Sequence, residues 1–168
     1  MKTGIFYSFS SGKTQSVAKR LVEEFGNNIE VNDIEEIKGS KFFEYDLIII
    51  GVSTWFSGGL PDAWEDFLPE FKYASFENKK VAIFGLGNQQ GYPENFGDAI
   101  SVLVEVLEPK GAKIIGFTST DGYDFDASKS IRDNKFMGLL IDEETQPELT
   151  VGRIKNWIKQ IKEEYSKN

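Results

Sequence analysis

The chain contains neither cysteine nor histidine among its 168 residues. Without thiols it cannot form disulfides, carry out thiol redox chemistry or ligate an iron–sulfur cluster, and structural zinc sites of the usual kind are excluded as well. Ser-His-Asp and Cys-His catalysis are excluded because essential members of both arrangements are missing. Any redox function would therefore require a bound organic cofactor.

Positive charge and long apolar runs are also scarce. The 19 Lys and Arg residues face 27 Asp and Glu residues, which gives a net charge of −8. This balance argues against nucleic-acid binding, and it fits either an acidic surface that docks basic protein partners or acidity that merely keeps the protein soluble. No apolar run reaches 18 residues, so no membrane span is predicted. The N-terminus lacks a signal-peptide pattern, and we expect a cytoplasmic protein.

Apolar runs alternate with helical patterns along the whole chain. The expected strands are 2–7, 29–33, 47–52, 81–85 and 114–118. The expected helices are 13–25, a short one near 40–45, 62–71, 95–110 and 150–165. Five βα units predict an α/β fold in one domain, residues 1–168, with a doubly wound parallel sheet of five strands.

One segment interrupts this alternation. Residues 119–135 are rich in Asp, Gly and Ser, and residues 136–141 have the pattern of a further strand. The simplest interpretation is a long loop inserted into the fifth strand, with the strand resuming after it. Loops of this length often have a function.

A turn rich in hydroxyl groups, residues 8–14, lies between the first strand and the first helix. A turn at a helix N-terminus offers unpaired N–H groups and the positive end of the helix dipole. The hydroxyls of Ser10, Ser11 and Thr14 add neutral donors. The turn therefore suits a phosphate without needing a cationic cluster, although the same residues would also serve as a simple helix cap.

Two further loops, 53–61 and 85–95, follow the third and fourth strands. In open α/β sheets, ligands bind at the carboxyl ends of the strands. Trp55 and Tyr92 lie among flexible residues and lack the spacing of core residues, whereas Trp64 and Trp157 have helical core spacing and are interpreted as structural. We interpret Trp55 and Tyr92 as two walls around a planar ring whose phosphate lies on the first turn.

These loops resemble those of the flavodoxins, in particular the long-chain type, over nearly the whole chain. The matching motifs are Ser11-Gly12-Lys13-Thr14, Thr54-Trp55 with Gly58, and Gly91-Tyr92-Pro93-Glu94-Asn95. The resemblance implies a flavodoxin-like sheet with strand order 2-1-3-4-5. It also implies a low-potential one-electron carrier with non-covalently bound FMN, a monomer that is not an enzyme. Its partners would be basic-surfaced redox proteins, namely a reductase donor and a low-potential acceptor.

The resemblance also assigns roles to residues. Backbone amides from Phe9 to Thr14 would hold the phosphate, Trp55 and Tyr92 would cover the two ring faces, and Asp121 would lie near the ribityl chain. The loop 54–58 would lie along the N5 edge of the ring and residues 87–90 along its pyrimidine edge. The candidate FMN-binding residues are Phe9, Ser10, Ser11, Gly12, Lys13, Thr14, Thr54, Trp55, Phe56, Ser57, Gly58, Gly87, Asn88, Gln89, Gln90, Tyr92, Asn95 and Asp121.

Two positions depart from the family pattern. Phe9 stands where the family usually has Ser or Thr, and the lost hydrogen bond would cost about 1.5–3 kcal/mol unless Ser8 or Ser10 replaces it. Asn88 stands where the family commonly has Asp. Without that carboxylate, the second reduction potential should be less negative than in the Asn88→Asp variant.

Two other classes of protein remain possible from the sequence. An FMN-dependent quinone or nitro reductase on a similar fold would need a substrate pocket beside the ring, and the loops of Trp55 and Tyr92 would leave only an edge open. A signalling receiver domain would need clustered acids after the first strand and an Asp after the third, where this chain has Ser8 and Ser53.

Overall fold

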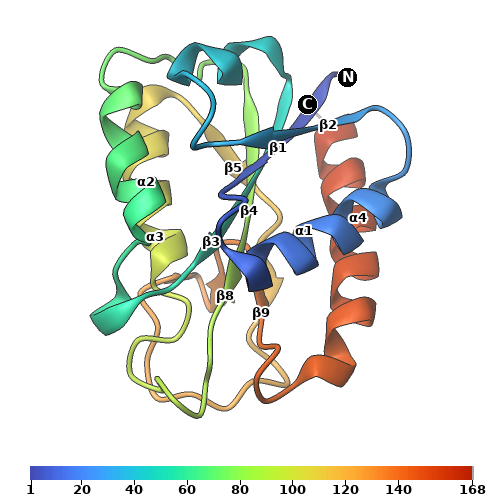
Figure 1. Cartoon of the computed structure of the whole chain (residues 1–168). Coiled ribbons are helices and arrows are strands. Elements are labelled where there is room, and N and C mark those ends of the chain that lie inside the picture. Colours follow the sequence, from blue (N-terminus) through green and yellow to red (C-terminus); the bar gives the residue numbers. More distant parts are fainter. Residues whose placement is uncertain (168) are drawn as a thin grey trace.

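A parallel sheet forms the centre of the molecule, which we describe from a computed structural model of residues 1–167 (Figure 1). The strands are β1 (Thr3–Tyr7), β2 (Ile29–Asp33), β3 (Leu47–Ser53), β4 (Lys80–Leu86), β5 (Lys113–Ile115) and β9 (Leu139–Ile141). The sheet order is β2-β1-β3-β4-β5, and β9 also pairs with β4. The predicted order and the predicted interruption of the fifth strand are both confirmed.

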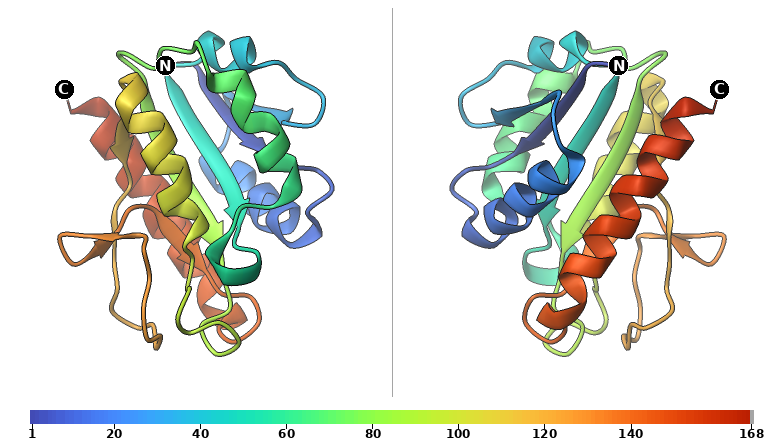
Figure 2. Two further views of the ribbon diagram at one scale, coloured as in Figure 1. Left: turned by 90° about the vertical axis from the view of Figure 1, so that its left-hand side faces the viewer. Right: turned by 90° about the vertical axis from the view of Figure 1, so that its right-hand side faces the viewer.

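Two helices cover each face of this sheet (Figures 1 and 2). The helices α1 (Gly12–Phe25) and α4 (Thr150–Ser166) pack on one face, and α2 (Asp62–Phe67) and α3 (Ala99–Leu107) pack on the other. Short 3-10 turns are η1 (Gly39–Glu44), η2 (Phe56–Gly58), η3 (Leu68–Phe71), η4 (Glu108–Lys110) and η5 (Pro147–Leu149). No helix within residues 1–167 is long and apolar enough to cross a membrane.

The central strand β3 is apolar on both faces because each face contacts a different helix layer. Ile48 and Ile50 join the core under α2 and α3, while Ile49 joins the core under α1 and α4. Trp64 and Trp157 are buried in these two cores, as their spacing predicted. Each indole N–H donates to a backbone carbonyl, at 3.1 Å and 2.8 Å respectively.

Proline accounts for two differences from the predicted helices. The helix expected over 62–71 ends at Phe67 and continues as η3, with Pro69 in its first turn. The helix expected over 95–110 passes into η4 in the same way at Pro109. Proline has no N–H and crowds the preceding turn, so a regular α-helix does not continue through it. The latter helix also begins late, at Ala99, because residues before it form a loop at the site.

The inserted segment is an ordered structure rather than a loose loop. It contains β6 (Thr118–Ser119), β7 (Ile131–Arg132) and β8 (Lys135–Phe136), which form a small antiparallel sheet in the order β6-β8-β7. The single strand expected over 136–141 is therefore divided into β8 and β9. Figure 2 shows the small sheet projecting beside the main body.

Aromatic packing attaches this insertion to the main domain. The ring of Phe136 lies 5.1 Å from that of Tyr123 and 6.0 Å from that of Phe96. The Tyr123 hydroxyl donates to the Leu140 carbonyl at 2.5 Å, and burial raises the pKa of Tyr123 to about 12. The hydroxyl therefore stays protonated at neutral pH and fastens the insertion to β9.

Candidate functional site

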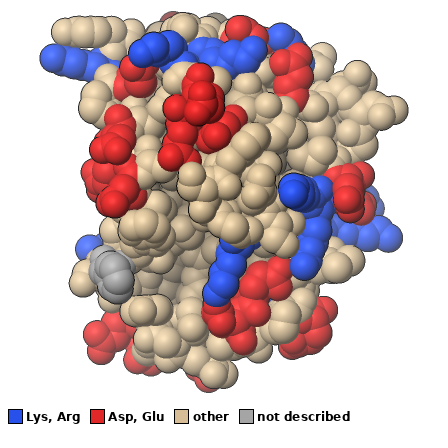
Figure 3. Space-filling model, in the orientation of Figure 1, with Lys and Arg blue, Asp and Glu red and all other residues tan. Residues whose placement is uncertain are grey.

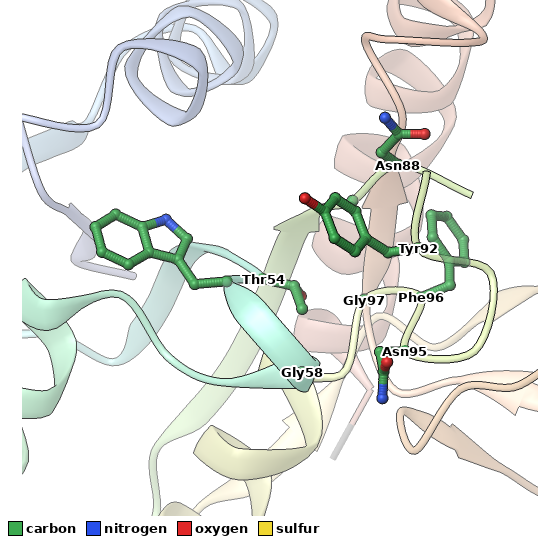
Figure 4. A pocket seen from close by; sticks show the side chains of 9 residues that line it. Thr54, Gly58, Asn88, Tyr92, Asn95, Phe96 and Gly97 are labelled. Carbon is green, nitrogen blue, oxygen red and sulfur yellow. The ribbon is translucent and has the colours of Figure 1, made fainter. Parts of the chain in front are cut away.

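Two loops enclose a cavity of about 350 Å³ at the carboxyl ends of β3 and β4 (Figure 4). Thr54 and Gly58 lie on one side of it, and Asn88 and Tyr92 lie on the other. Its lining residues are Thr54, Trp55, Gly58, Gly87, Asn88, Tyr92, Asn95, Phe96 and Gly97. All of them except Phe96 and Gly97 belong to the set predicted from the sequence.

A second cavity, of about 200 Å³, lies between the first turn and the end of β3. Its lining residues are Ser8, Ser10, Ser11, Thr14, Glu35, Gly51, Val52, Ser53, Trp55, Pro61, Asp62, Ala63 and Trp64. Trp55 lines both cavities. Trp55 therefore lies between the larger cavity and the turn that was predicted to hold a phosphate.

Trp55 and Tyr92 are far more exposed than aromatic residues of the core. Their exposed fractions are 45% and 54%, whereas Trp64 and Trp157 are each 1% exposed. Solvent-facing aromatic walls around a cavity commonly mark a ligand site. Both side chains are therefore available to a ligand at the cavity, and their contact with one stays a prediction.

The loop that carries Trp55 is a tight turn. The Trp55 amide donates to the Gly59 carbonyl at 2.8 Å, and the Trp55 carbonyl accepts the amides of Gly58 and Gly59 at 3.0 Å. Ser57 and Gly58 have left-handed φ angles of 55° and 85°, and a Cβ on Gly58 would lie 2.6 Å from an Asp98 carboxylate oxygen. Glycine is therefore required at position 58. The side chain of Phe56 lies outside the part of the chain that the structure describes.

Side-chain hydrogen bonds fix the shape of both loops. Thr54 Oγ1 accepts the amide of Ala99 at 3.2 Å and so ties the first loop to the start of α3. Asn88 Oδ1 accepts the amides of Gln90 and Gly91 at 3.1 Å and 2.7 Å. This Asn88 turn presents Tyr92 at the cavity, so Asn88 shapes the loop as well as lining the site.

Gln89 points away from the cavity, into the protein. Its backbone and side-chain N–H groups donate to Asp142 Oδ2 at 3.0 Å and 2.9 Å. Asp142 is fully buried and also accepts the amides of Glu144 and Thr145 and the hydroxyl of Thr145, at 2.6–3.1 Å. Neither sequence spacing nor residue type indicated this contact, since it joins residues 53 positions apart.

Besides Gln89, six of the predicted residues line neither cavity, namely Phe9, Gly12, Lys13, Ser57, Gln90 and Asp121. Gln90 and Asp121 are exposed, and the Asp121 amide donates to Ser119 Oγ. The Lys13 ammonium forms an ion pair with Glu144, and its side chain is 67% exposed. Lys13 therefore does not add positive charge to the lining of the second cavity.

The first turn presents neutral donors at the N-terminus of α1. Ser11 occupies the N-cap position but makes no capping bond, and its hydroxyl instead donates to Thr14 Oγ1 at 2.9 Å. Within residues 1–167, no protein acceptor is hydrogen-bonded to the amides of Gly12, Lys13 or Thr14. Unpaired amides at a helix N-terminus are well suited to a phosphate.

Two carboxylates from the end of β2 reach this turn, and the sequence did not reveal either contact. The Phe9 amide donates to Asp33 Oδ1 at 3.2 Å, so it does not point into the cavity. The Ser8 hydroxyl donates to Glu35 Oε2 at 2.5 Å. Hydrogen bonds from Ser8 and then Ser10 hold the pKa of Glu35 below its ordinary value. The acid is therefore ionised at neutral pH.

Fold and site together define a class, namely a doubly wound α/β protein with a site suited to a planar ring that carries a phosphate. Sequence comparison identifies the family within that class. A family model described as flavodoxin matches residues 5–157. The chain is 44% identical over 165 residues to a flavodoxin of Nostoc sp., which covers 98% of this chain and 97% of that protein. The chain therefore belongs to the flavodoxin family.

Other similar proteins agree with this assignment. Flavodoxin 1 of Escherichia coli is 41% identical over 164 residues, covering 96% of this chain and 93% of that protein. The crystal structure of Fusobacterium nucleatum flavodoxin bound to flavin mononucleotide matches with a TM-score of 0.92 at 34% identity. This match covers 98% of this chain and 99% of that one.

Proposed function

We propose that this protein is a low-potential one-electron carrier that binds FMN non-covalently and has no substrate of its own. The observation that carries the proposal is the pair of adjoining cavities joined at Trp55, with an aromatic-walled space on one side and a hydroxyl-rich helix N-terminus on the other. A flavodoxin at 34% identity is described as bound to flavin mononucleotide. These features favour a carrier over a quinone or nitro reductase.

The residues present fit FMN at both of its ends. A phosphate needs several donors and an opening at a helix N-terminus, and the free amides of residues 12–14 with the Ser11 and Thr14 hydroxyls supply them. A flavin ring needs apolar faces, which Trp55 and Tyr92 offer. When bound, FMN supplies the one-electron chemistry, and the protein supplies position and electrostatics.

Each group of residues has a distinct part in this proposal. The first turn anchors the phosphate through neutral donors, and the two aromatic side chains exclude water from the ring faces. The turn at Ser57 and Gly58 and the backbone at Gly87 face the ring edges. The proposed contacts at the larger cavity are Thr54, Trp55, Gly58, Gly87, Asn88, Tyr92 and Asn95.

We also propose basic-surfaced redox proteins as the partners, one donating and one accepting electrons, and a monomeric protein in the cytoplasm. The net charge of −8 supports this choice. Figure 3 shows acidic side chains at the lower end of the molecule, where the strands of Figure 1 end, and also over its upper half, with some basic side chains among them. Like-signed charge around a redox site would steer oppositely charged partners toward it.

Titration of the purified protein with FMN tests the binding proposal. We expect one equivalent of protein to quench the fluorescence of one equivalent of FMN, because Trp55 and Tyr92 would lie against the ring. A protein that leaves the fluorescence unchanged would contradict the proposal. Steady oxidation of NADPH by the FMN-loaded protein alone would instead favour the reductase.

The Asn88→Asp variant tests the electrostatic part of the proposal. Aspartate keeps the Oδ1 acceptor that orders the loop, so mainly the charge changes. We expect the more negative of the two one-electron potentials to fall by tens of millivolts, since roughly 1 kcal/mol of charge repulsion corresponds to about 40 mV. Redox titration with reference dyes measures it. Gln90→Glu is the matched control, because it adds the same charge outside both cavities, and an unchanged or higher potential in Asn88→Asp contradicts the prediction.

A further inference from the structure

Glu35 accepts a hydrogen bond from the Ser8 hydroxyl, a group that could otherwise donate one to a phosphate in the smaller cavity. Its carboxylate accepts the hydroxyl of Ser8 at 2.5 Å, and the oxygen of that hydroxyl accepts the Ser10 amide at 3.2 Å. Ser8 is buried and lines the smaller cavity together with Ser10. The Ser8 hydroxyl has a single proton to donate, so it cannot donate to Glu35 and to a phosphate at the same time.

The charges at this cavity are unbalanced. Among the described residues, its lining includes the carboxylates of Glu35 and Asp62 but no lysine or arginine, and Lys13 is paired with Glu144 elsewhere. Asp62 lies at the start of α2, whereas Glu35 is hydrogen-bonded directly to the turn. An anionic ligand in this cavity would therefore meet like charge from Glu35, which is bonded to Ser8 in the same lining.

We propose that Glu35 limits the affinity of this protein for FMN, by adding like charge at the phosphate end of the site and by keeping the Ser8 hydroxyl for itself. The inference rests on the proposed function. It concerns the phosphate only, because Glu35 does not line the larger cavity that would hold the ring. It also answers the question raised by Phe9, since Ser8 does not replace the missing hydroxyl while Glu35 holds it.

The effect of Glu35 on affinity is expected to be moderate. The side chain is exposed, and water screens interactions between exposed charges strongly. Removing its charge should therefore change the affinity for a phosphorylated ligand by about tenfold rather than by several orders of magnitude. The affinity for riboflavin, which has the ring but lacks the phosphate, should stay the same.

The test compares Glu35→Gln with the wild-type protein and with Glu36→Gln as a matched control. Glutamine removes the charge but keeps an acceptor for Ser8, so this variant isolates the effect of the charge. Glu35→Ala also releases the Ser8 hydroxyl and should bind FMN more tightly than Glu35→Gln. The neighbouring Glu36 is also exposed but lines neither cavity. Dissociation constants for FMN and for riboflavin are measured by fluorescence quenching at constant ionic strength. We expect Glu35→Gln to bind FMN about tenfold more tightly, with riboflavin unchanged within about twofold, and Glu36→Gln to change neither.

Each other outcome has a defined meaning. If Glu36→Gln raised the affinity for FMN as much as Glu35→Gln does, the effect would be one of net charge in general. If Glu35→Gln bound FMN more weakly than the wild-type protein, the carboxylate would be supporting the turn. Either result overturns the inference. An equal rise in the affinity of Glu35→Gln for FMN and for riboflavin overturns the inference as well. If the wild-type protein quenches neither flavin, the proposed function itself has failed, and this is distinguishable from all of the results above.

Discussion

Replacing Asp142 by alanine is expected to lower the free energy of unfolding by about 3–5 kcal/mol, because it removes a buried carboxylate and leaves several buried donors unpaired. Asp142 accepts hydrogen bonds from the backbone amide and the side-chain amide of Gln89 and from the backbone amides of Glu144 and Thr145. Urea unfolding of the protein without added FMN measures the change directly. A loss comparable to that of an ordinary surface substitution would contradict the role assigned to this carboxylate.

Glu144→Ala is the control for the Asp142 prediction. Its side chain is 45% exposed, and its only ion pair among residues 1–167 is with Lys13 at the surface. Exposed pairs of this kind contribute about 0–1 kcal/mol. Asp142→Asn gives an intermediate case, because the amide keeps one acceptor but presents N–H groups to the Gln89 donors. We expect its loss of stability to lie between those of the other two variants.

Replacing Trp55 by alanine is expected to weaken FMN binding by about 10- to 100-fold. Stacking of an aromatic side chain on a flat heterocycle contributes about 1–3 kcal/mol, and tenfold in affinity corresponds to about 1.4 kcal/mol. Because Trp55 lines the larger cavity, riboflavin should lose affinity as well, in contrast to the effect expected at Glu35. Fluorescence titration with both flavins measures the two constants.

Two further variants control the Trp55 prediction. Trp55→Phe keeps an aromatic wall and should recover part of the affinity. Tyr73→Ala removes an aromatic side chain that is 90% exposed and lines neither cavity, so it should change nothing. Trp55 is half exposed, and its loss should alter the stability of the FMN-free protein only slightly. Unchanged affinity for both flavins in Trp55→Ala would rule out the indole as a ring wall.

Most of the fold is predictable because its signals are local. The run 47–50 is apolar on both faces, and this pattern already indicates a buried parallel strand. The exposed aromatic residues also have a local signal, because Trp55 and Tyr92 lie in glycine-rich loops and lack the helical spacing of core residues. Local pattern also indicated the insertion, because residues 119–135 are polar and residues 136–141 have the apolar pattern of a strand again.

The parts that the sequence did not reveal depend on contacts between distant residues. Gln89 was expected to face the ligand, but its partner Asp142 becomes visible only when β9 is placed beside β4. Glu35 reaches Ser8 because β2 and β1 are parallel neighbours. Residues 95–98 have a helical pattern, yet they support the inserted segment. The Asp98 carboxylate accepts the Lys129 amide at 2.8 Å, and the Phe96 amide donates to the Ala127 carbonyl at 3.2 Å. Such pairings have no signature in spacing or residue type.

The dependence of the Tyr92 loop on Asp142 and Thr145 also bears on biosynthesis. These residues follow Gln89 by 53 and 56 positions, so a ribosome must synthesise a further third of the polypeptide before the loop has its support. A nascent chain that has exposed only its first four strands would carry the phosphate turn without a braced ring pocket. Cofactor loading would then be an event of the finished polypeptide, and not one that guides its early folding.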